Sequence, residues 1–378
     1  MFVLLDAFAL LYLLVPTLAF QFFILIKNLQ LKKGITPSDR VNVPVSVVIC
    51  ARNEFENLKK NLPSILNQNY PYFEVVVVND RSWDDSRFFL EDMAGRHARL
   101  KVVHVPENDK FWSGKKFALT LGIKAASYDT LLFSDADCRP SSQNWISEMM
   151  SGYSTPDKQI VLGYGGYERK PGLLNLIIRF ETLQTGWLYL TSAIAGMPFM
   201  AVGRNLSYTR ALFFQAKGFS THMHIPSGDD DLFVNQTATH RNTSVVINPR
   251  AITVSTPKSS WSDYIYQRRR HFTTSAHYHL TSKVYLAIYQ LSRMLVFLIS
   301  AISLAGSVYG IDDYIVPLLL TLTYYSFRWY SLVTFGKLSG DGTLGWWYPL
   351  LSVAVVLVQL RVWIENLIFG SPKAWKRK

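Results

Sequence analysis

Cysteine is scarce in this chain, since only Cys50 and Cys138 occur among its 378 residues. A pair this sparse indicates neither a disulfide framework nor a metal site built from thiolates, and both are predicted to be small core residues. Acidic residues are also few: 27 Asp and Glu stand against 39 Lys and Arg, which gives a formal net charge of +12. Such an excess favours anionic partners, namely nucleic acid, lipid headgroups or phosphorylated substrates.

Charge is almost absent from residues 2–26, where Asp6 is the only charged side chain. About 20 apolar residues suffice to cross a hydrocarbon core of about 30 Å. The segment has no basic stretch before it and is too long for the apolar part of a signal peptide, so residues 1–27 are predicted to be a transmembrane helix. Basic residues follow at Lys27, Lys32, Lys33 and Arg40. By the positive-inside rule, they place the next domain in the cytoplasm.

Three further apolar segments occupy the C-terminal part, and Arg328 interrupts the second of them. The segments are residues 294–311, 314–335 and 343–360. They predict a membrane region over residues 284–369, followed by a basic tail over residues 370–378. Three crossings would leave that tail outside the cytoplasm, against the charge rule, so the alternative is that one segment is re-entrant or interfacial. We expect an integral protein of the inner or cell membrane, which favours lipid and phosphorylated partners over nucleic acid.

Residues 41–280 show the rhythm of an α/β domain, in which short apolar runs alternate with helical patterns such as residues 55–66. The β-rich runs that predict strands are residues 45–50, 74–78, 101–105 and 130–133, and within them residues 47–49 and 75–78 are continuously apolar. Uninterrupted apolar runs are typical of parallel strands that are covered on both faces. The sequence therefore predicts an open, twisted, mainly parallel sheet, whose ligands lie beyond the carboxyl ends of the strands.

Polar side chains follow three of the predicted strands. Arg52, Asn53 and Glu54 come after the first, Asp80 and Arg81 after the second, and Asp135 and Asp137 after the fourth. Residues i and i+2 of a strand point the same way, so the last two carboxylates can converge on one hard cation. Taken alone, such a pair is also typical of a turn, in which carboxylates accept hydrogen bonds from backbone N–H groups.

Two segments mix apolar and aromatic residues with charge and are predicted to lie in the headgroup plane of the membrane. Residues 173–200 contain Arg179 and Glu181, and residues 261–280 contain three consecutive arginines. For the first segment, an ordinary amphipathic packing helix is an equal alternative.

In the order of these motifs, the chain resembles the membrane-attached family-2 glycosyltransferases, which include ceramide-glucosyltransferase-like enzymes and processive polysaccharide synthases. The resemblance covers residues 44–271. It implies a GT-A-type, Rossmann-like domain that binds a nucleotide sugar and is flanked by transmembrane helices. It also implies an inverting, metal-dependent transfer from a nucleotide-sugar donor, with UDP as the expected nucleotide, to a lipid or membrane-proximal acceptor.

On the donor side, the resemblance implies that Ala51, Arg52 and Glu54 contact the nucleotide and that Asp80 binds its base. The G-K-x-x-A-L pattern at residues 114–119 places Lys115 near the donor. In the D-x-D motif, Asp135 approaches the ribose and the metal, and Asp137 ligates Mg²⁺ or Mn²⁺. Oxygen ligands suit both ions and do not choose between them.

On the acceptor side, Asn205 lies in a G-x-N segment within residues 199–219, which implies a substrate-binding role. Asp229 is the implied catalytic base, because residues 228–232 stand in the place of E-D-x-D-L, with Gly228 where the family has glutamate. Repulsion among three consecutive aspartates is expected to raise the proton affinity of at least one of them.

Gln267 and Arg270 correspond to the conserved positions of the family's Q-x-x-R-W motif, and both are implied catalytic residues. His271 replaces the tryptophan, and the smaller ring favours transfer of a single sugar over long polymers. For Arg268 and Arg269, anchoring to lipid headgroups is an equal alternative. The rival functions are a processive polysaccharide synthase, and, from another class, an inactive nucleotide-sugar-binding or scaffold membrane protein.

Overall fold

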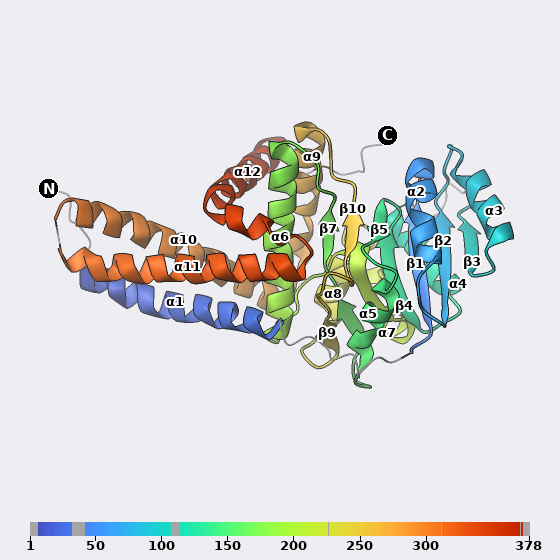
Figure 1. The fold of residues 1–378 in the computed structure, drawn as a ribbon, viewed down its shortest axis with the longest axis horizontal. Coiled ribbons are helices and arrows are strands. Elements are labelled where there is room, and N and C mark those ends of the chain that lie inside the picture. The colour runs from blue at the N-terminus through green and yellow to red at the C-terminus, as the bar shows by residue number, and fades with distance from the viewer. Residues whose placement is uncertain are drawn as a thin grey trace.

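The computed structural model describes residues 7–31, 42–106, 114–225, 227–310, 312–370 and 372. Asp6, the basic residues at positions 32, 33 and 40, and nearly all of the basic tail lie outside these described residues. Figure 1 shows a long helical bundle at one end of the molecule and a sheet domain at the other. The bundle consists of α1 (Ala7–Gln30), α10 (Leu280–Val308) and α11 (Ile315–Leu338), and α6 (Leu173–Ile194) lies where the bundle meets the sheet domain.

The central sheet has seven strands in the order β3-β2-β1-β4-β8-β6-β9. The four predicted strands are confirmed as β1 (Val45–Ala51), β2 (Phe73–Asn79), β3 (Leu100–His104) and β4 (Thr130–Asp135). They pair in parallel, as do β6 (Ile160–Leu162) and β9 (Thr243–Val245), whereas β8 (Leu206–Thr209) is antiparallel to both of its neighbours. The mainly parallel sheet that the apolar runs predicted is therefore present.

Burial of both sheet faces explains why the valine runs form central strands. Val75 and Val77 pack in the same cluster as α2 (Phe55–Leu66) and Leu90 of α3 (Ser86–Arg96). Val78 faces the other way, toward α4 (Lys115–Ala125). Gly122 lets α4 approach closely, since a Cβ there would lie 2.8 Å from side-chain carbons of Val48 and Val78. Packing on both faces fixes which residues end at the carboxyl edge of the sheet.

A second, three-stranded sheet begins directly after Asp137 and fixes the position of that carboxylate. Its order is β5-β10-β7, with β5 (Cys138–Pro140) antiparallel to β10 (Thr253–Ser255) and β7 (Gly165–Tyr167) parallel to it. The remaining α-helices are α5 (Trp145–Met150), α7 (Arg210–Gln215), α8 (Asp231–Thr237), α9 (Trp261–His271) and α12 (Tyr348–Phe369).

Helix α6 is a packing helix, which was one of the two alternatives for residues 173–200. Trp187 is fully buried and donates from its indole Nε1 to Ser331 Oγ of α11 at 2.7 Å. Tyr189 donates from its hydroxyl to the backbone oxygen of Gly163 at 2.6 Å. One side of α6 is thus bonded to the bundle and another to the sheet domain, so the two parts are held together by specific contacts.

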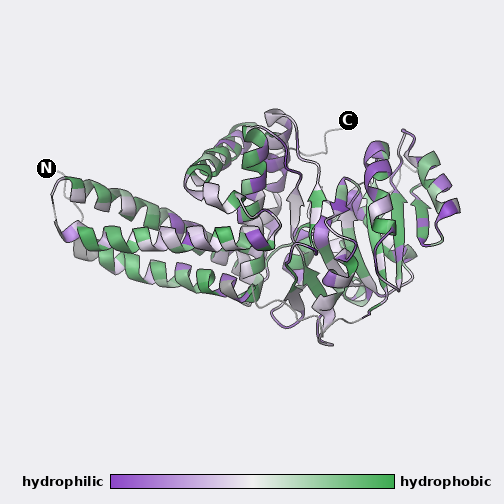
Figure 2. Cartoon of the chain, in the orientation of Figure 1, coloured by the Kyte–Doolittle hydropathy of each residue, from purple (hydrophilic) through white to green (hydrophobic). Residues whose placement is uncertain are grey.

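Polar side chains join the three helices of the bundle. Gln21 of α1 donates to Ser292 Oγ of α10 at 2.5 Å and accepts from the Tyr324 hydroxyl of α11 at 3.2 Å. Hydrogen bonds of this kind hold helices together where apolar surroundings provide no hydrophobic drive. In Figure 2, α1 and α10 are coloured mainly as hydrophobic, whereas α11 has a mixed colouring. By length and composition, three helices of the described residues can cross a membrane, at Leu10–Asn28, Leu280–Val308 and Leu344–Phe369.

Candidate active site

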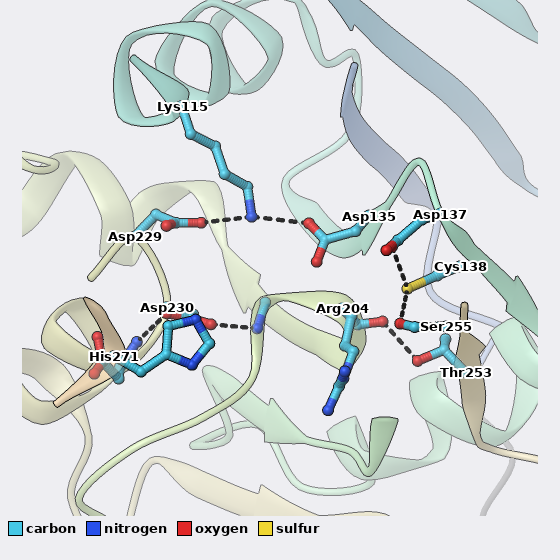
Figure 3. Close-up of polar contacts among 12 residues, drawn as sticks. Lys115, Asp135, Asp137, Cys138, Arg204, Asp229, Asp230, Thr253, Ser255 and His271 are labelled. Carbon is cyan, nitrogen blue, oxygen red and sulfur yellow. Dashed lines mark hydrogen bonds and ion pairs between the residues drawn. The ribbon is translucent and has the colours of Figure 1, made fainter. Parts of the chain in front are cut away.

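One lysine joins two carboxylates that lie far apart in the sequence. Lys115 Nζ lies 2.8 Å from Asp135 Oδ1 and 3.0 Å from Asp229 Oδ2 (Figure 3). Lys115 is the first residue of α4, Asp135 ends β4, and Asp229 lies two residues before α8. Burial alone would lower the pKa of Lys115, but these two carboxylates raise it well above its ordinary value. The site therefore holds a fixed positive charge between its predicted donor and acceptor sides.

Asp135 and Asp137 form an acidic pair at the end of β4, as the motif predicted. Their carboxylate oxygens and the Cys138 sulfur lie within 4.8 Å of one another. Burial, the Asp135 carboxylate and the Glu54 carboxylate raise the pKa of Asp137 to about 6. A bound cation would relieve this repulsion, so the pair fits a divalent metal. Cys138 is buried and bonded to Ser255 Oγ at 2.8 Å, and hard cations such as Mg²⁺ or Mn²⁺ prefer oxygen, so the carboxylates are the expected ligands.

The three consecutive aspartates have different surroundings. Burial alone would raise the pKa of Asp229, but the ion pair with Lys115 holds it below its ordinary value. Burial and the carboxylates on either side raise the pKa of Asp230 to about 7, and Asp230 accepts from the Gly203 N–H at 2.6 Å. Asp231 accepts from the hydroxyls of Thr274 and Tyr278 and is thereby fixed to the chain after α9. The expected repulsion thus contributes to the raised pKa of Asp230, whereas burial is the main cause of the raised pKa of Asp231 and the pKa of Asp229 is lowered.

Helix α9 supplies the basic side of the site. Arg270 is buried, and the Asp229 and Asp230 carboxylates are among the charges that act on it. Figure 3 includes His271, whose Nε2 is 3.3 Å from Arg270 Nη2. A guanidinium can only donate, so this contact makes Nε2 an acceptor and places the ring proton on Nδ1. Gln267, on the preceding turn, is partly exposed.

Arg268 is bonded within the protein, which bears on the alternative that it anchors lipid headgroups. Its Nη2 lies 2.9 Å from Glu181 Oε1 of α6, and the Tyr264 hydroxyl donates to the other oxygen of the same carboxylate. Glu181 is buried, so replacing Arg268 by a neutral residue would leave the buried Glu181 carboxylate without a counterion. These contacts fix α9 against α6 and thereby orient Arg270.

The predicted nucleotide residues lie at the carboxyl ends of β1 and β2, next to each other. Asp80 is buried, accepts from Arg81 Nε at 2.8 Å, and donates its backbone N–H to the Ala51 oxygen at 2.8 Å. Arg52 is exposed, and Glu54 borders an open depression of about 380 Å³. The depression is lined by Asn53, Glu54, Phe55, Glu56, Asn57, Asp84 and Asp85. Its acidic lining suits hydroxyl and amino groups of a nucleoside better than phosphates.

Asn205 is fully buried, and its side-chain amide is engaged by the protein. Its Oδ1 accepts from Trp145 Nε1 at 3.0 Å, and its Nδ2 donates to the backbone oxygens of Tyr164 and Ala251, each at 2.8 Å. The amide is thus bonded to the protein on both sides, and the substrate-binding role that the motif implied stays a prediction.

Arg204 is a site residue that the sequence reasoning missed. Its guanidinium carbon lies 4.4 Å from the ring centroid of Tyr167, and its buried Nε has no hydrogen-bond partner among the described residues. Its charge acts on Asp137, so it borders the acidic pair. The only sequence signal was a basic residue between Gly203 and Asn205.

Comparison with known protein families identifies part of the sheet domain. The model of glycosyl transferase family 2 matches residues 46–209, which include β1, β4 and the acidic pair. The chain contains a family-2 glycosyltransferase domain. The resemblance inferred from the motifs is confirmed for this part of the chain. Asp229 and α9 lie beyond the matched residues.

Two curated relatives and one solved structure are similar to the chain. It is 34% identical over 93 residues to a poly-beta-1,6-N-acetyl-D-glucosamine synthase of Staphylococcus epidermidis, covering 25% of this chain and 21% of the relative. It is 29% identical over 140 residues to a 4,4'-diaponeurosporenoate glycosyltransferase of Staphylococcus haemolyticus, covering 35% of this chain and 36% of the relative. The chain thus matches well under two thirds of the length of these relatives.

The solved structure is a mannosyltransferase of Pyrobaculum calidifontis in complex with GDP-Man and Mn²⁺. Its TM-score is 0.57 at 17% identity, and the match covers 95% of this chain and 99% of that one. Such low identity carries only the fold, which is GT-A-like with a mainly parallel sheet, as predicted.

Proposed function

We propose that this protein is an inverting, metal-dependent glycosyltransferase that moves a sugar from a nucleotide-sugar donor to a lipid or membrane-proximal acceptor. The observation that carries this proposal is the contact of Lys115 with both Asp135 and Asp229. This contact joins Asp135, which is on the predicted donor side of the site, to Asp229, which is predicted to be the base. A scaffold protein would have no need to place these groups within reach of one reacting centre.

Asp229 is the proposed base. It is ionised in the present arrangement, because the ion pair with Lys115 lowers its pKa, so it can accept a proton. The proton of the acceptor hydroxyl passes to Asp229 as the oxygen forms a bond to the anomeric carbon. The bond from that carbon to the donor phosphate breaks, and its electron pair leaves with the nucleoside diphosphate. One displacement of this kind inverts the configuration.

The departing diphosphate gains negative charge, which Lys115 and Arg270 are placed to stabilise. A divalent cation held by Asp135 and Asp137 would add Lewis-acid charge at the same group. Arg204 borders these carboxylates and extends the positive surface. The net positive charge of the chain favours an anionic donor. The cationic side chains that would bind this donor lie at the carboxyl edge of the sheet.

A lipid or membrane-proximal acceptor is supported by the position of α9. This helix carries Gln267 and Arg270 and is bonded to α6, the helix between the sheet domain and the bundle. An acceptor held in the membrane surface would therefore meet the site on the side of α9. The diaponeurosporenoate relative is named for a non-polymeric acceptor, which fits the same class. The cytoplasmic side remains the proposed location of the sheet domain.

The donor assignment is tested by equilibrium binding to the purified full chain in nanodiscs. We expect a UDP-sugar to bind in Mn²⁺ or Mg²⁺ and to lose at least about tenfold in affinity in excess chelator, because the diphosphate then faces Asp135 and Asp137 without a cation. Asp80→Asn should also weaken binding, whereas Asp92→Asn, an exposed residue of α3, should not. GDP-sugars are a useful comparison, since the structural neighbour holds GDP-Man. Absence of binding to every nucleotide sugar would favour the scaffold alternative.

A processive polysaccharide synthase is the second candidate, because one relative is named for a polymer. His271 supports single transfer, since it offers a smaller stacking face than the family's tryptophan. We expect wild-type products of one added sugar, whose length does not increase with incubation time. Chromatographic sizing of products from wild type and His271→Trp measures this. Wild-type polymer of many units that lengthens with time would promote the processive alternative.

A further inference from the structure

Composition and packing disagree about which C-terminal helices cross the membrane. α12 is long and apolar enough to cross, and α11 is not among the three helices that meet this criterion. Several polar residues of α11, however, face inward. Thr321, Tyr324 and Arg328 are buried, whereas Ile315, Leu319 and Leu322 are exposed. Although Thr323 and Ser326 are exposed as well, large apolar side chains make up most of the outer face, so α11 is suited to contact lipid.

Arg328 is accommodated inside the protein. Its Nη2 donates to the Tyr289 hydroxyl of α10 at 3.0 Å, and its guanidinium carbon lies 4.6 Å from the ring centroid of Trp187 on α6. Charged residues within membrane helices usually face the interior of the bundle in this way. α11 therefore belongs with α1 and α10 as a membrane-crossing helix.

The segment before α12 and the C-terminal end of α12 are both bonded to helices next to the sheet domain. Before the helix, Asp341 pairs with Arg179 of α6. At its C-terminal end, Arg269 of α9 donates to Asn366 Oδ1 at 3.0 Å and to the Gly370 oxygen at 2.7 Å. The neighbouring Arg268 is bonded to Glu181, two residues beyond Arg179 on α6. The segment before α12 and the C-terminal end of α12 are thus attached to neighbouring parts of α6 and α9.

A membrane-crossing helix cannot have both ends on one side. The 22 residues of α12 extend over about 33 Å, which would carry its end across the hydrocarbon core if it ran along the membrane normal. In Figure 1, α12 stays beside α6 and α9 and does not extend along the bundle. Its inner side packs on the protein through Leu351, Val355 and Val358.

We infer that α12 lies in the plane of the membrane, embedded in the leaflet next to the sheet domain, and that only α1, α10 and α11 cross. Its outer surface fits lipid acyl chains, since Leu350, Val353, Leu357, Leu360 and Leu367 are exposed. Three crossings put the chain after Gly370 on the side of the sheet domain. The basic tail then obeys the charge rule, and residues 309–310 and 312–314, which contain no Lys or Arg, lie on the opposite side.

The side of the C-terminus distinguishes this arrangement from a fourth crossing. A peptide tag after Lys378 of the full chain, and a second tag inserted after Gly310, are probed with antibodies in sealed membrane vesicles of known orientation. An antibody against residues 42–106 reports the sheet domain. The C-terminal tag should be accessible together with the sheet domain and protected when the Gly310 tag is accessible. A C-terminal tag on the side of Gly310 would overturn the inference.

Depth measurements test whether α12 lies in the plane. Single nitroxide labels are placed at Leu350, Leu357 and Leu367 of α12, with Leu291 and Leu304 of α10 as the matched crossing control. Cys50 and Cys138 are replaced in a background whose melting temperature matches wild type. The three α12 labels should show similar depth, whereas the α10 labels should differ. A continuous depth gradient along α12 would overturn an in-plane helix. These readouts hold whether or not the chain transfers a sugar.

Discussion

Asp137→Asn is expected to reduce sugar transfer by at least about 10²-fold, because it removes a ligand of the charge that stabilises the leaving diphosphate. Its carboxylate lies beside Asp135, and burial together with that neighbour raises its pKa to about 6. A cation is the group that would offset this repulsion. Single-turnover transfer and Mn²⁺ titration of the purified variant measure the loss, and an unchanged melting temperature would show that the fold is intact.

The matched control for this variant is Asp157→Asn, which changes an exposed carboxylate far from the acidic pair in sequence. It should leave both transfer and metal dependence unchanged. Wild-type transfer that continues undiminished in excess chelator would contradict a metal role for Asp135 and Asp137.

Asp229→Asn is expected to slow transfer by about 10²–10⁴-fold, the usual cost of removing a general base. Donor affinity should stay within a few-fold of wild type, because the proposed donor contacts of Asp80, Asp135 and Asp137 remain. Rapid-quench transfer separates this loss from donor binding. Asp231→Asn is the structural comparison, since Asp231 accepts hydrogen bonds from Thr274 and Tyr278, and its loss should lower the melting temperature more than the rate.

The pH profile decides between Asp229 and Asp230 as the base. Lys115 keeps the pKa of Asp229 below its ordinary value, so Asp229 stays ionised as the pH falls from 8 to 6, and transfer at saturating metal should persist. The pKa of Asp230 is raised to about 7, so a reaction that needs its ionised form would be lost as the pH falls through about 7. An inactive Asp230→Asn beside an active Asp229→Asn would show that Asp230 is the base.

The central strands were predictable because a strand that is buried on both faces has apolar residues at consecutive positions. β1, β2 and β4 are covered on both faces, and each contains an uninterrupted stretch of apolar residues. The shorter strands β6, β8 and β9 were not predicted, since three or four residues are too few to show a period. Their place in the sheet is set by pairing with β4 and with each other, which sequence spacing does not reveal.

The site was predictable where a motif places a side chain at a strand end, as for Asp135. The site was harder to predict where neighbouring residues lie in one segment, because tertiary packing decides which of their side chains faces the active site. Asn205 and Arg204 are adjacent, yet Asn205 is enclosed by Trp145 and Arg204 borders the acidic pair. The three aspartates after Gly228 likewise differ only through their partners, which come from α4, the chain around Gly203 and the residues after α9.

Transfer of label from radioactive nucleotide sugars tests the central proposal most directly. The purified full chain is incubated with each donor, Mn²⁺ and a membrane lipid extract, and the products are divided into an organic phase and an ethanol-insoluble fraction. Label should enter the organic phase with one nucleotide sugar, need the divalent cation, and be lost with Asp229→Asn. Label that appears only in insoluble polymer, or in no product with any donor, would contradict single transfer to a lipid acceptor.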